Sequence, residues 1–333
     1  MEKSDYKIHN RVSILFTCIG RRVSLLERFR ASSRDLALGV NIIGTDATPL
    51  SAALQLCDAK YVVNPVRHPE YLDEILGIVA RERVNLLVPT TDLDLQLLAD
   101  NKAAFDALGC RVLVSSPQVI GICQDKRKTF RFLSQHGFDT PLTLDAAQDL
   151  SKQDLSYPCF LKPWDGHASR GTAKVENERE LEVMAARIPN CIVQEFVEGI
   201  EYTCDAFVDF DMRVRCVVPR QRIETRGGEV SKGRTVRNEA IMSRTADLVE
   251  VLGAGPGVIT IQLIVVAGEN IKFIEINPRF GGGVPLSIKA GADFPRWILE
   301  QLAGRKPDIQ FGRFTDNLTM LRYDSEVWIE PQP

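Results

Sequence analysis

The residues best suited to chemistry lie late in the chain, in the segment 271–283, Ile-Lys-Phe-Ile-Glu-Ile-Asn-Pro-Arg-Phe-Gly-Gly-Gly. Its first seven residues alternate between apolar and polar, as in a half-buried strand, so Glu275 and Asn277 are expected on one face. Arg279 joins them if the chain stays extended through Pro278. A carboxylate, an amide oxygen and a guanidinium beside a run of glycines predict a metal–phosphate site.

The strand that precedes this segment is expected to supply a further oxygen ligand. Residues 258–266 read as a strand, and Ala-Gly-Glu-Asn at 267–270 reads as a hairpin loop. If Val266 pairs with Ile271, Gln262 lies directly opposite Glu275, because each is four residues further from the turn. The alternative is an ordinary hairpin whose polar residues simply face water.

A second candidate is the small-residue loop at 163–172, which follows a strand that ends in Lys162. Gly166, Ser169 and Gly171 allow backbone N–H groups to approach phosphate oxygens closely. The loop does not match the P-loop pattern, and a glycine loop alone is a weak signal.

Arginines mark two further candidate anion sites. Arg21 and Arg22 stand at a predicted helix N-terminus, where they oppose the helix dipole unless an anion binds there; otherwise they are solvated. Between residues 213 and 237 there are eight basic residues and only two acidic ones, Glu224 and Glu229. This local surplus of positive charge indicates either an anion-binding loop or a solvated hairpin tip.

Composition excludes several classes of function. The 333 residues predict two or three domains, and the net charge of −3 argues against binding to nucleic acid or to anionic membranes. The eight cysteines form no Cys-x-x-Cys pair and four histidines add no zinc pattern, so we expect free thiols in a reducing cytoplasm. No apolar run approaches membrane-spanning length.

The elements that would position these residues begin with an alternating α/β unit. Strands are predicted at 11–18, 40–46, 59–63, 85–89 and 111–114, with helical spacing between most of them. This order favours a parallel sheet, in which ligands bind beyond the carboxyl ends of the strands. A single helix is predicted over 118–137, and strands follow at 191–197, 201–209, 214–219 and 318–323.

The order of these parts resembles the ATP-grasp superfamily. The resemblance rests on Lys162 with its glycine loop, Gln-Glu-Phe-Val-Glu-Gly at 194–199 with Glu201, Gln262, and Glu-Ile-Asn-Pro-Arg at 275–279. The chain looks most like the synthetase half of carbamoyl-phosphate synthase and the stand-alone proteins similar to it. The resemblance implies an α/β and α+β fold with these parts: a Rossmann-like pre-ATP-grasp domain (1–115), a subdomain with the glycine loop (116–190), a subdomain with the metal site (191–312) and a terminal strand (313–333).

The resemblance also implies a cofactor set of ATP and Mg²⁺, with Mn²⁺ as an alternative and two ions expected. It assigns catalytic roles to Arg279, Lys162, Asn277 and Arg234. It assigns ATP binding to Lys126, Lys162, Gly166, Ser169, Gly171, Glu195, Phe196, Val197, Glu201 and Gln262. It assigns metal binding to Gln262, Glu275 and Asn277. We expect substrate contacts from Arg21, Arg22, Asp92, Lys232 and Gly282.

The implied function is an ADP-forming ligase that activates a substrate carboxylate as an acyl phosphate for attack by an amine. A synthase that phosphorylates bicarbonate and a silent nucleotide-binding regulator are the alternatives. Phe-Gly-Gly-Gly after Arg279 departs from the bicarbonate enzymes, and no biotin-lysine motif is present. The expected partners are a small carboxylate and a small amine, with a homodimer as an open option.

Overall fold

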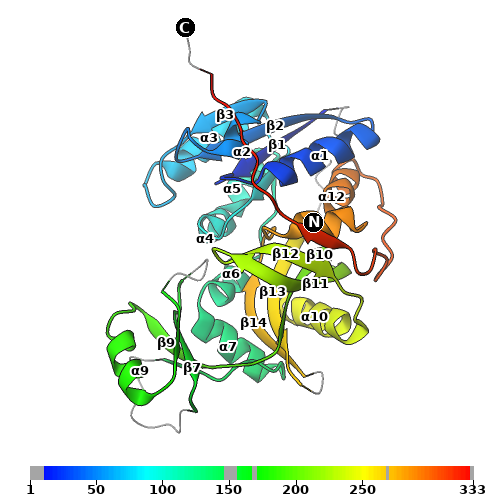
Figure 1. Ribbon diagram of the computed structural model, residues 1–333. Helices are drawn as coiled ribbons and strands as arrows, with labels where there is room; N and C mark the ends of the chain where they lie inside the picture. The colour runs from blue at the N-terminus through cyan, green and yellow to red at the C-terminus, as the bar shows by residue number, and fades with distance from the viewer. Residues whose placement is uncertain (1–10, 146–155, 167–170, 268–269, 331–333) are drawn as a thin grey trace.

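The computed structural model describes residues 11–145, 156–166, 171–267 and 270–330. The first of its three sheets is five-stranded, parallel and ordered β3-β2-β1-β4-β5, as predicted (Figure 1). Its strands are β1 (Arg11–Thr17), β2 (Gly39–Asp46), β3 (Ala59–Val62), β4 (Leu86–Pro89) and β5 (Arg111–Val112).

Helices cover both faces of this sheet because its central strands are apolar on both sides. Val12, Ile14 and Phe16 of β1 share a core with α1 (Val23–Asp35) and α2 (Ala52–Gln55). Leu15 faces the other core, which α3 (Tyr71–Glu82), α4 (Leu95–Asp100) and α5 (Lys102–Ala107) complete.

The single helix predicted over 118–137 is wrong, because the structure has two helices there, α6 (Pro117–Cys123) and α7 (Lys126–Gln135). Asp125 separates them in an extended conformation, and its carboxylate accepts the backbone N–H of Arg127 as an N-cap. The break makes Lys126 the first residue of α7.

The second sheet is a small antiparallel one with its own core. Its order is β6-β9-β7-β8, and α9 (Glu178–Ala185) packs beside it. The strands are β6 (Thr143–Asp145), β7 (Cys159–Pro163), β8 (Ala173–Val175) and β9 (Cys191–Glu195). The predicted division at 190 separates β9 from this sheet, and we propose to move that boundary beyond Glu195.

The third sheet has the order β14-β13-β10-β11-β12-β15 and carries most of the candidate site. Its strands are β10 (Ile200–Val208), β11 (Val214–Arg226), β12 (Glu229–Thr235), β13 (Gly257–Val265), β14 (Ile271–Asn277) and β15 (Thr319–Leu321). The helices α10 (Glu239–Leu252), α11 (Val284–Lys289) and α12 (Phe294–Leu302) complete this part.

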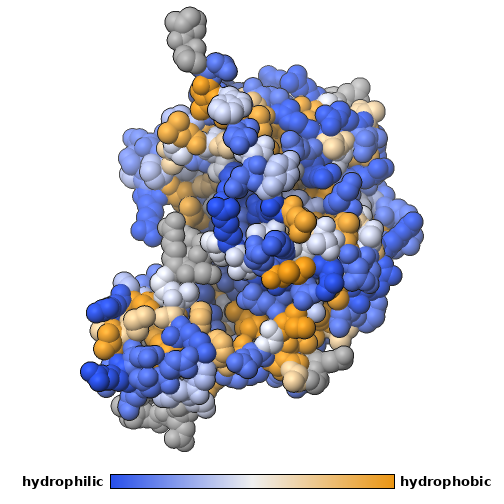
Figure 2. All heavy atoms as spheres, in the orientation of Figure 1, coloured by the Kyte–Doolittle hydropathy of each residue, from blue (hydrophilic) through white to orange (hydrophobic). Residues whose placement is uncertain are grey.

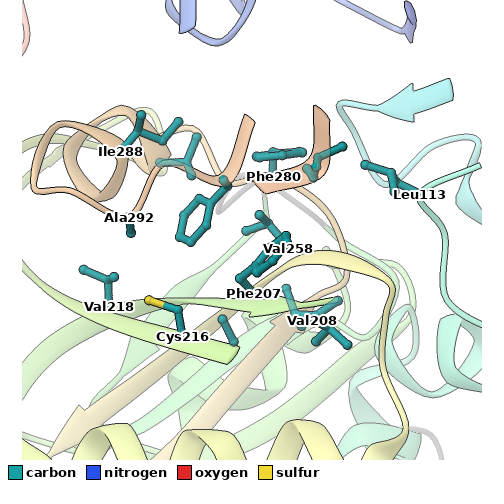
Figure 3. Close-up of a cluster of buried hydrophobic side chains, with 14 of the residues drawn as sticks. Leu113, Phe207, Val208, Cys216, Val218, Val258, Phe280, Ile288 and Ala292 are labelled. Carbon is teal, nitrogen blue, oxygen red and sulfur yellow. The ribbon is translucent and has the colours of Figure 1, made fainter. Parts of the chain in front are cut away.

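One apolar core joins the first sheet to the third. Figure 3 shows Leu113, which follows β5, at one side of a buried cluster. The same cluster holds Phe207 of β10, Val258 of β13 and Phe280, which follows β14. Phe29 of α1 also meets Phe280 edge to face, with ring centroids 6.1 Å apart. Because Phe280 directly follows Arg279, this core fixes the candidate site against the first sheet. No helix in the described ranges is long and apolar enough to cross a membrane.

Candidate active site

The pairing of Gln262 with Glu275 is confirmed, although the route to it differs from the prediction. Val265, not Val266, pairs with Ile271, and the Val266 N–H bonds to the Asn270 carbonyl near the turn. An irregularity in β14 then restores the predicted partners. The middle of the predicted loop, residues 268–269, lies outside the described residues.

That irregularity is a β-bulge at Ile274, and burial explains it. Leu263 pairs with Phe273 while Gln262 pairs with Glu275, so Ile274 is the extra residue. Phe273 and Ile276 are both buried although they stand three residues apart. Regular alternation would turn Glu275 into that core, whereas the bulge keeps both apolar side chains inside and sends Glu275 to the opposite face.

This opposite face borders a cavity of about 310 Å³ between the third sheet and the loops at the carboxyl ends of the first sheet. Gln262, Glu275 and Asn277 all line it. Within the described residues, the side chains of Gln262 and Glu275 make no hydrogen bond, so their oxygens are uncommitted. Oxygen donors that include one carboxylate fit Mg²⁺, which keeps its remaining positions for water and phosphate.

A second hollow of about 560 Å³ adjoins the cavity, because Glu201 and Arg222 line both. It contains Lys162, Glu195, Phe196 and Val197, as the predicted nucleotide contacts require. The two hollows together lie between the second and third sheets and continue towards the first.

Lys162 is only 6% exposed where β7 enters this second hollow. Burial lowers its pKa to about 8; the charge of Glu275 opposes this effect and that of Lys126 adds to it. The Lys126 ammonium donates to the Gly166 carbonyl, so both lysines gather at the start of the glycine loop. Gly171 has a φ of +67°, as a glycine permits, whereas Ser169 lies outside the described residues.

Contacts at the other end of the second hollow hold the segment 195–197, which is predicted to bind ATP. The Lys272 ammonium lies 2.6 and 2.8 Å from the two carboxylate oxygens of Glu195, which also accepts the Leu142 N–H. The Lys174 ammonium lies 4.6 Å from the Phe196 ring centroid. The Glu195 carboxylate and N–H are therefore both committed, and β9 is paired on both sides. The backbone beyond β9, at Phe196 and Val197, is the part placed to contact a nucleotide.

Arg279 lines the cavity and is hydrogen-bonded to Asp92, which follows β4 of the first sheet. Its Nε and Nη2 donate to Asp92 Oδ2 at 3.1 and 2.6 Å, and Nη2 also reaches Asn277 Oδ1 at 3.2 Å. Asp92, expected to contact substrate, therefore orients this guanidinium, and both residues line the cavity.

The triple glycine, 281–283, is explained by close side chains. A Cβ on Gly281 would lie 2.9 Å from Thr260 Oγ1, and a Cβ on the next residue would lie 2.8 Å from Arg22 Nη1. A Cβ on the third glycine would collide with the guanidinium of Arg220. Each glycine thus makes room for a different polar side chain beside the cavity.

A buried ion pair beneath the cavity was missed from the sequence. Arg220 donates twice to Asp205, at 2.8 and 2.9 Å, and the Ser287 hydroxyl donates to the same carboxylate at 2.6 Å. A lone aspartate in the apolar strand 202–208 was the available signal, because a buried carboxylate needs a charged partner.

Six of the predicted residues that the structure describes line neither the cavity nor the adjoining hollow: Lys126, Gly166 and Gly171, at or beside the glycine loop, and Arg21, Lys232 and Arg234. Arg21 is exposed beside Glu229, and Lys232 pairs with Glu224. Arg234 bonds to Gln221, whose ladder neighbour Tyr202 lies opposite the buried Leu263. This register places Arg234 on the face away from Gln262, so its predicted catalytic role has no support from the geometry.

Comparison with known proteins agrees with this arrangement. Residues 123–283 match the model of the ATP-grasp domain, and residues 14–113 match that of the PylC-like, N-terminal domain. A D-alanine–D-alanine ligase of Bacteroides fragilis is 25% identical over 52% of this chain and 58% of its own length. The carbamoyl phosphate synthase large chain of Rubrobacter xylanophilus is 26% identical over 72% of this chain and 24% of its own length.

A solved structure has the same fold across most of the chain. It is that of an L-amino acid ligase from Bacillus licheniformis, with a TM-score of 0.68, 20% identity, and coverage of 88% of this chain and 74% of that one. The matches to the two curated relatives span less than two thirds of the length of either. The resemblance drawn from the sequence is confirmed at the level of domains: the chain carries an ATP-grasp domain behind a PylC-like N-terminal domain.

Proposed function

We propose that the protein is an ATP-dependent ligase that converts a substrate carboxylate into an acyl phosphate and transfers the acyl group to an amine. The observation that carries the proposal is the placement of Glu275 opposite Gln262, with Asn277 in the same cavity and the buried Lys162 in the adjoining hollow. The named relatives include a D-alanine–D-alanine ligase and an L-amino acid ligase, which supports the proposal.

The residues fit magnesium and ATP. Gln262, Glu275 and Asn277 would hold the ion, which would supply neutralising charge to the phosphates. Mn²⁺ prefers similar ligands. Lys126 and Lys162 would bind phosphate oxygens, and Glu201 would accept from the ribose hydroxyls.

The chain's own groups then account for the proposed reaction. A carboxylate oxygen attacks the γ-phosphorus, the bond from phosphorus to ADP breaks, and ADP leaves. Arg279, oriented by Asp92, stabilises the transferring oxygens through its positive charge. The amine nitrogen next attacks the acyl carbon, phosphate leaves, and the amine gives up a proton.

The setting of the reaction is part of the same proposal. We propose small-molecule partners, a cytoplasmic location and, as an option, a homodimer. All eight cysteines are free, which supports a reducing compartment. The sequence Phe-Gly-Gly-Gly after Arg279 departs from that of the bicarbonate enzymes which the chain resembles, and this favours an organic acid over bicarbonate as the activated group.

Release of ADP and phosphate, measured over a panel of organic acids, amino acids and bicarbonate, tests the proposal. Glu275→Gln and Lys162→Ala should each abolish ADP formation while the circular dichroism spectrum is kept. Lys128→Ala is the matched control, because Lys128 is an exposed residue of α7. Near-normal ADP formation in either site variant would overturn the assignment. Tight ATP binding without turnover on any acid would favour a silent regulator.

A further inference from the structure

Three arginines from distant parts of the chain converge on Glu229 at the edge of the cavity. Arg21 and Arg22 precede α1, and Arg322 follows β15. Their guanidinium nitrogens lie 3.3, 3.0 and 3.0 Å from the Glu229 carboxylate. This acid–arginine cluster, Arg21, Arg22, Glu229 and Arg322, is where the first sheet, β12 and the C-terminal segment meet.

The acid–arginine cluster carries a surplus of positive charge, since three cations face one carboxylate. Burial opposes ionisation of Glu229, yet Arg22, Arg322 and Arg21 hold its pKa at about 2. The carboxylate is therefore already saturated with cations and is a poor site for a substrate ammonium group. Figure 2 shows a strongly hydrophilic group of atoms near the middle of this face of the molecule.

Within the acid–arginine cluster, Arg22 is the member that enters the cavity together with Glu229. Its side chain is 18% exposed, and its described hydrogen bonding is a single contact, from Nη1 to Glu229. A guanidinium has five N–H donors in a planar fork, so most of the donors of Arg22 remain available to a ligand.

The other arginines that line the cavity have fewer donors to offer. All three nitrogens of Arg222 are hydrogen-bonded to protein oxygens, and so are those of Arg279. Arg220 gives two nitrogens to Asp205. By this comparison Arg22 is the cavity's available cation.

The surroundings of Arg22 also favour an anion beside it. Burial lowers the pKa of Arg22; the charge of Glu229 opposes this effect, and that of Arg279 adds to it. Two like charges thus repel each other at one cavity. Gly282 lacks the Cβ that would lie 2.8 Å from Arg22 Nη1, so the backbone is shaped around this guanidinium.

We propose that Arg22, positioned by Glu229, binds a second anionic group of the substrate. The acid activated by this protein would then carry a further carboxylate or a phosphate in addition to the carboxylate that is phosphorylated. This inference rests on the proposed function and names the class of its substrate. A carboxylate or phosphate would meet the Arg22 fork in a bidentate manner.

Binding measured by isothermal titration calorimetry tests the inference without relying on turnover. The probes are glutarate, 3-phosphonopropionate and valerate, which offer a second carboxylate, a phosphonate and no second anion. We expect glutarate or 3-phosphonopropionate to bind at least about tenfold more tightly than valerate, since hydrogen bonds between charged groups are strong. The tighter of the two identifies the source of the anion.

Variants assign the effect to Arg22. Arg22→Gln should lose the tenfold preference and Arg22→Lys should lose part of it, because lysine keeps the charge without the fork. Arg21→Gln is the matched control: it removes the same charge beside the same Glu229, but Arg21 does not line the cavity. An unchanged preference in both Arg22 variants, an equal loss in Arg21→Gln, or equal binding of valerate by the wild type would overturn the inference.

ADP binding separates this inference from the proposed function. Wild type and Arg22→Gln should bind ADP with magnesium equally, because Arg22 does not line the hollow that holds Lys162 and Glu195. If ADP binds and the anion preference is absent, the substrate class alone is wrong. If ADP does not bind to the wild type, the proposed function fails.

Discussion

Removing the charge of Asp205 should cost more stability than any other single carboxylate change near the site. The Arg220–Asp205 pair is almost completely dry, with side chains 2% and 0% exposed. Asp205→Asn keeps the shape of the side chain and leaves the Arg220 guanidinium without its counter-charge. The Ser287 hydroxyl would still find an acceptor, so the expected loss comes from the stranded cation.

The magnitude follows from burial. Breaking a fully buried ion pair by removing one partner costs ~3–5 kcal/mol, because the remaining charge is not solvated. Asp209→Asn is the matched control, since Asp209 pairs with Arg215, which is 27% exposed. Asparagine can keep the two backbone N–H bonds that Asp209 accepts, so we expect a loss of ~1 kcal/mol or less there.

Urea unfolding followed by circular dichroism measures both losses. The double variant Asp205→Leu with Arg220→Met removes both charges together, and it should regain most of the stability lost in Asp205→Asn. A loss below ~1 kcal/mol in Asp205→Asn, or a double variant less stable than the single one, would refute the reasoning that buried charge decides the outcome.

Four further predictions concern the cavity and the adjoining hollow. Burial lowers the pKa of Lys162 to about 8, so the ligand-free protein loses this charge above that pH. The affinity for ADP, measured by calorimetry, should therefore fall above pH 8, and Lys162 should take up a proton when ADP binds. An ADP affinity that does not change with pH would contradict this. The same group should add stability from pH 8 towards 10.5, its usual value, since the unfolded chain holds the proton more tightly there. Gly282→Ala should displace Arg22, because the new Cβ would lie 2.8 Å from Arg22 Nη1. KM for the acid should rise while KM for ATP stays near wild type. An unchanged KM for the acid would show that Arg22 moves aside without loss of substrate binding. Asp92→Asn should lower kcat by about ten- to a hundredfold through misplacement of Arg279, and steady-state kinetics with normal kcat would show that the contact is dispensable.

Much of the fold was predictable because its signals are local. The alternation of strands and helices in the first third predicted the parallel sheet, since buried strands and amphipathic helices differ in the spacing of apolar residues. The hairpin predicted the Gln262–Glu275 pair by counting from its turn. The outcome was right because the bulge at Ile274 compensated a register shift of one residue, and that bulge arises from the core demands of Phe273 and Ile276.

The tertiary structure decided which polar side chains share the cavity. Arg234 belongs to the basic segment 213–237, but its pairing with Gln221 places it on the face of the third sheet away from Gln262. Neighbouring residues of a strand point to opposite faces, so a difference of one residue in register decides which side chains reach the cavity. Arg22 and Glu229, 207 positions apart, meet only because α1 packs against the helices that follow the triple glycine. Sequence periodicity reports which face of an element is apolar, and it carries no record of which distant charge will stand opposite; the packing of whole sheets and helices settles that.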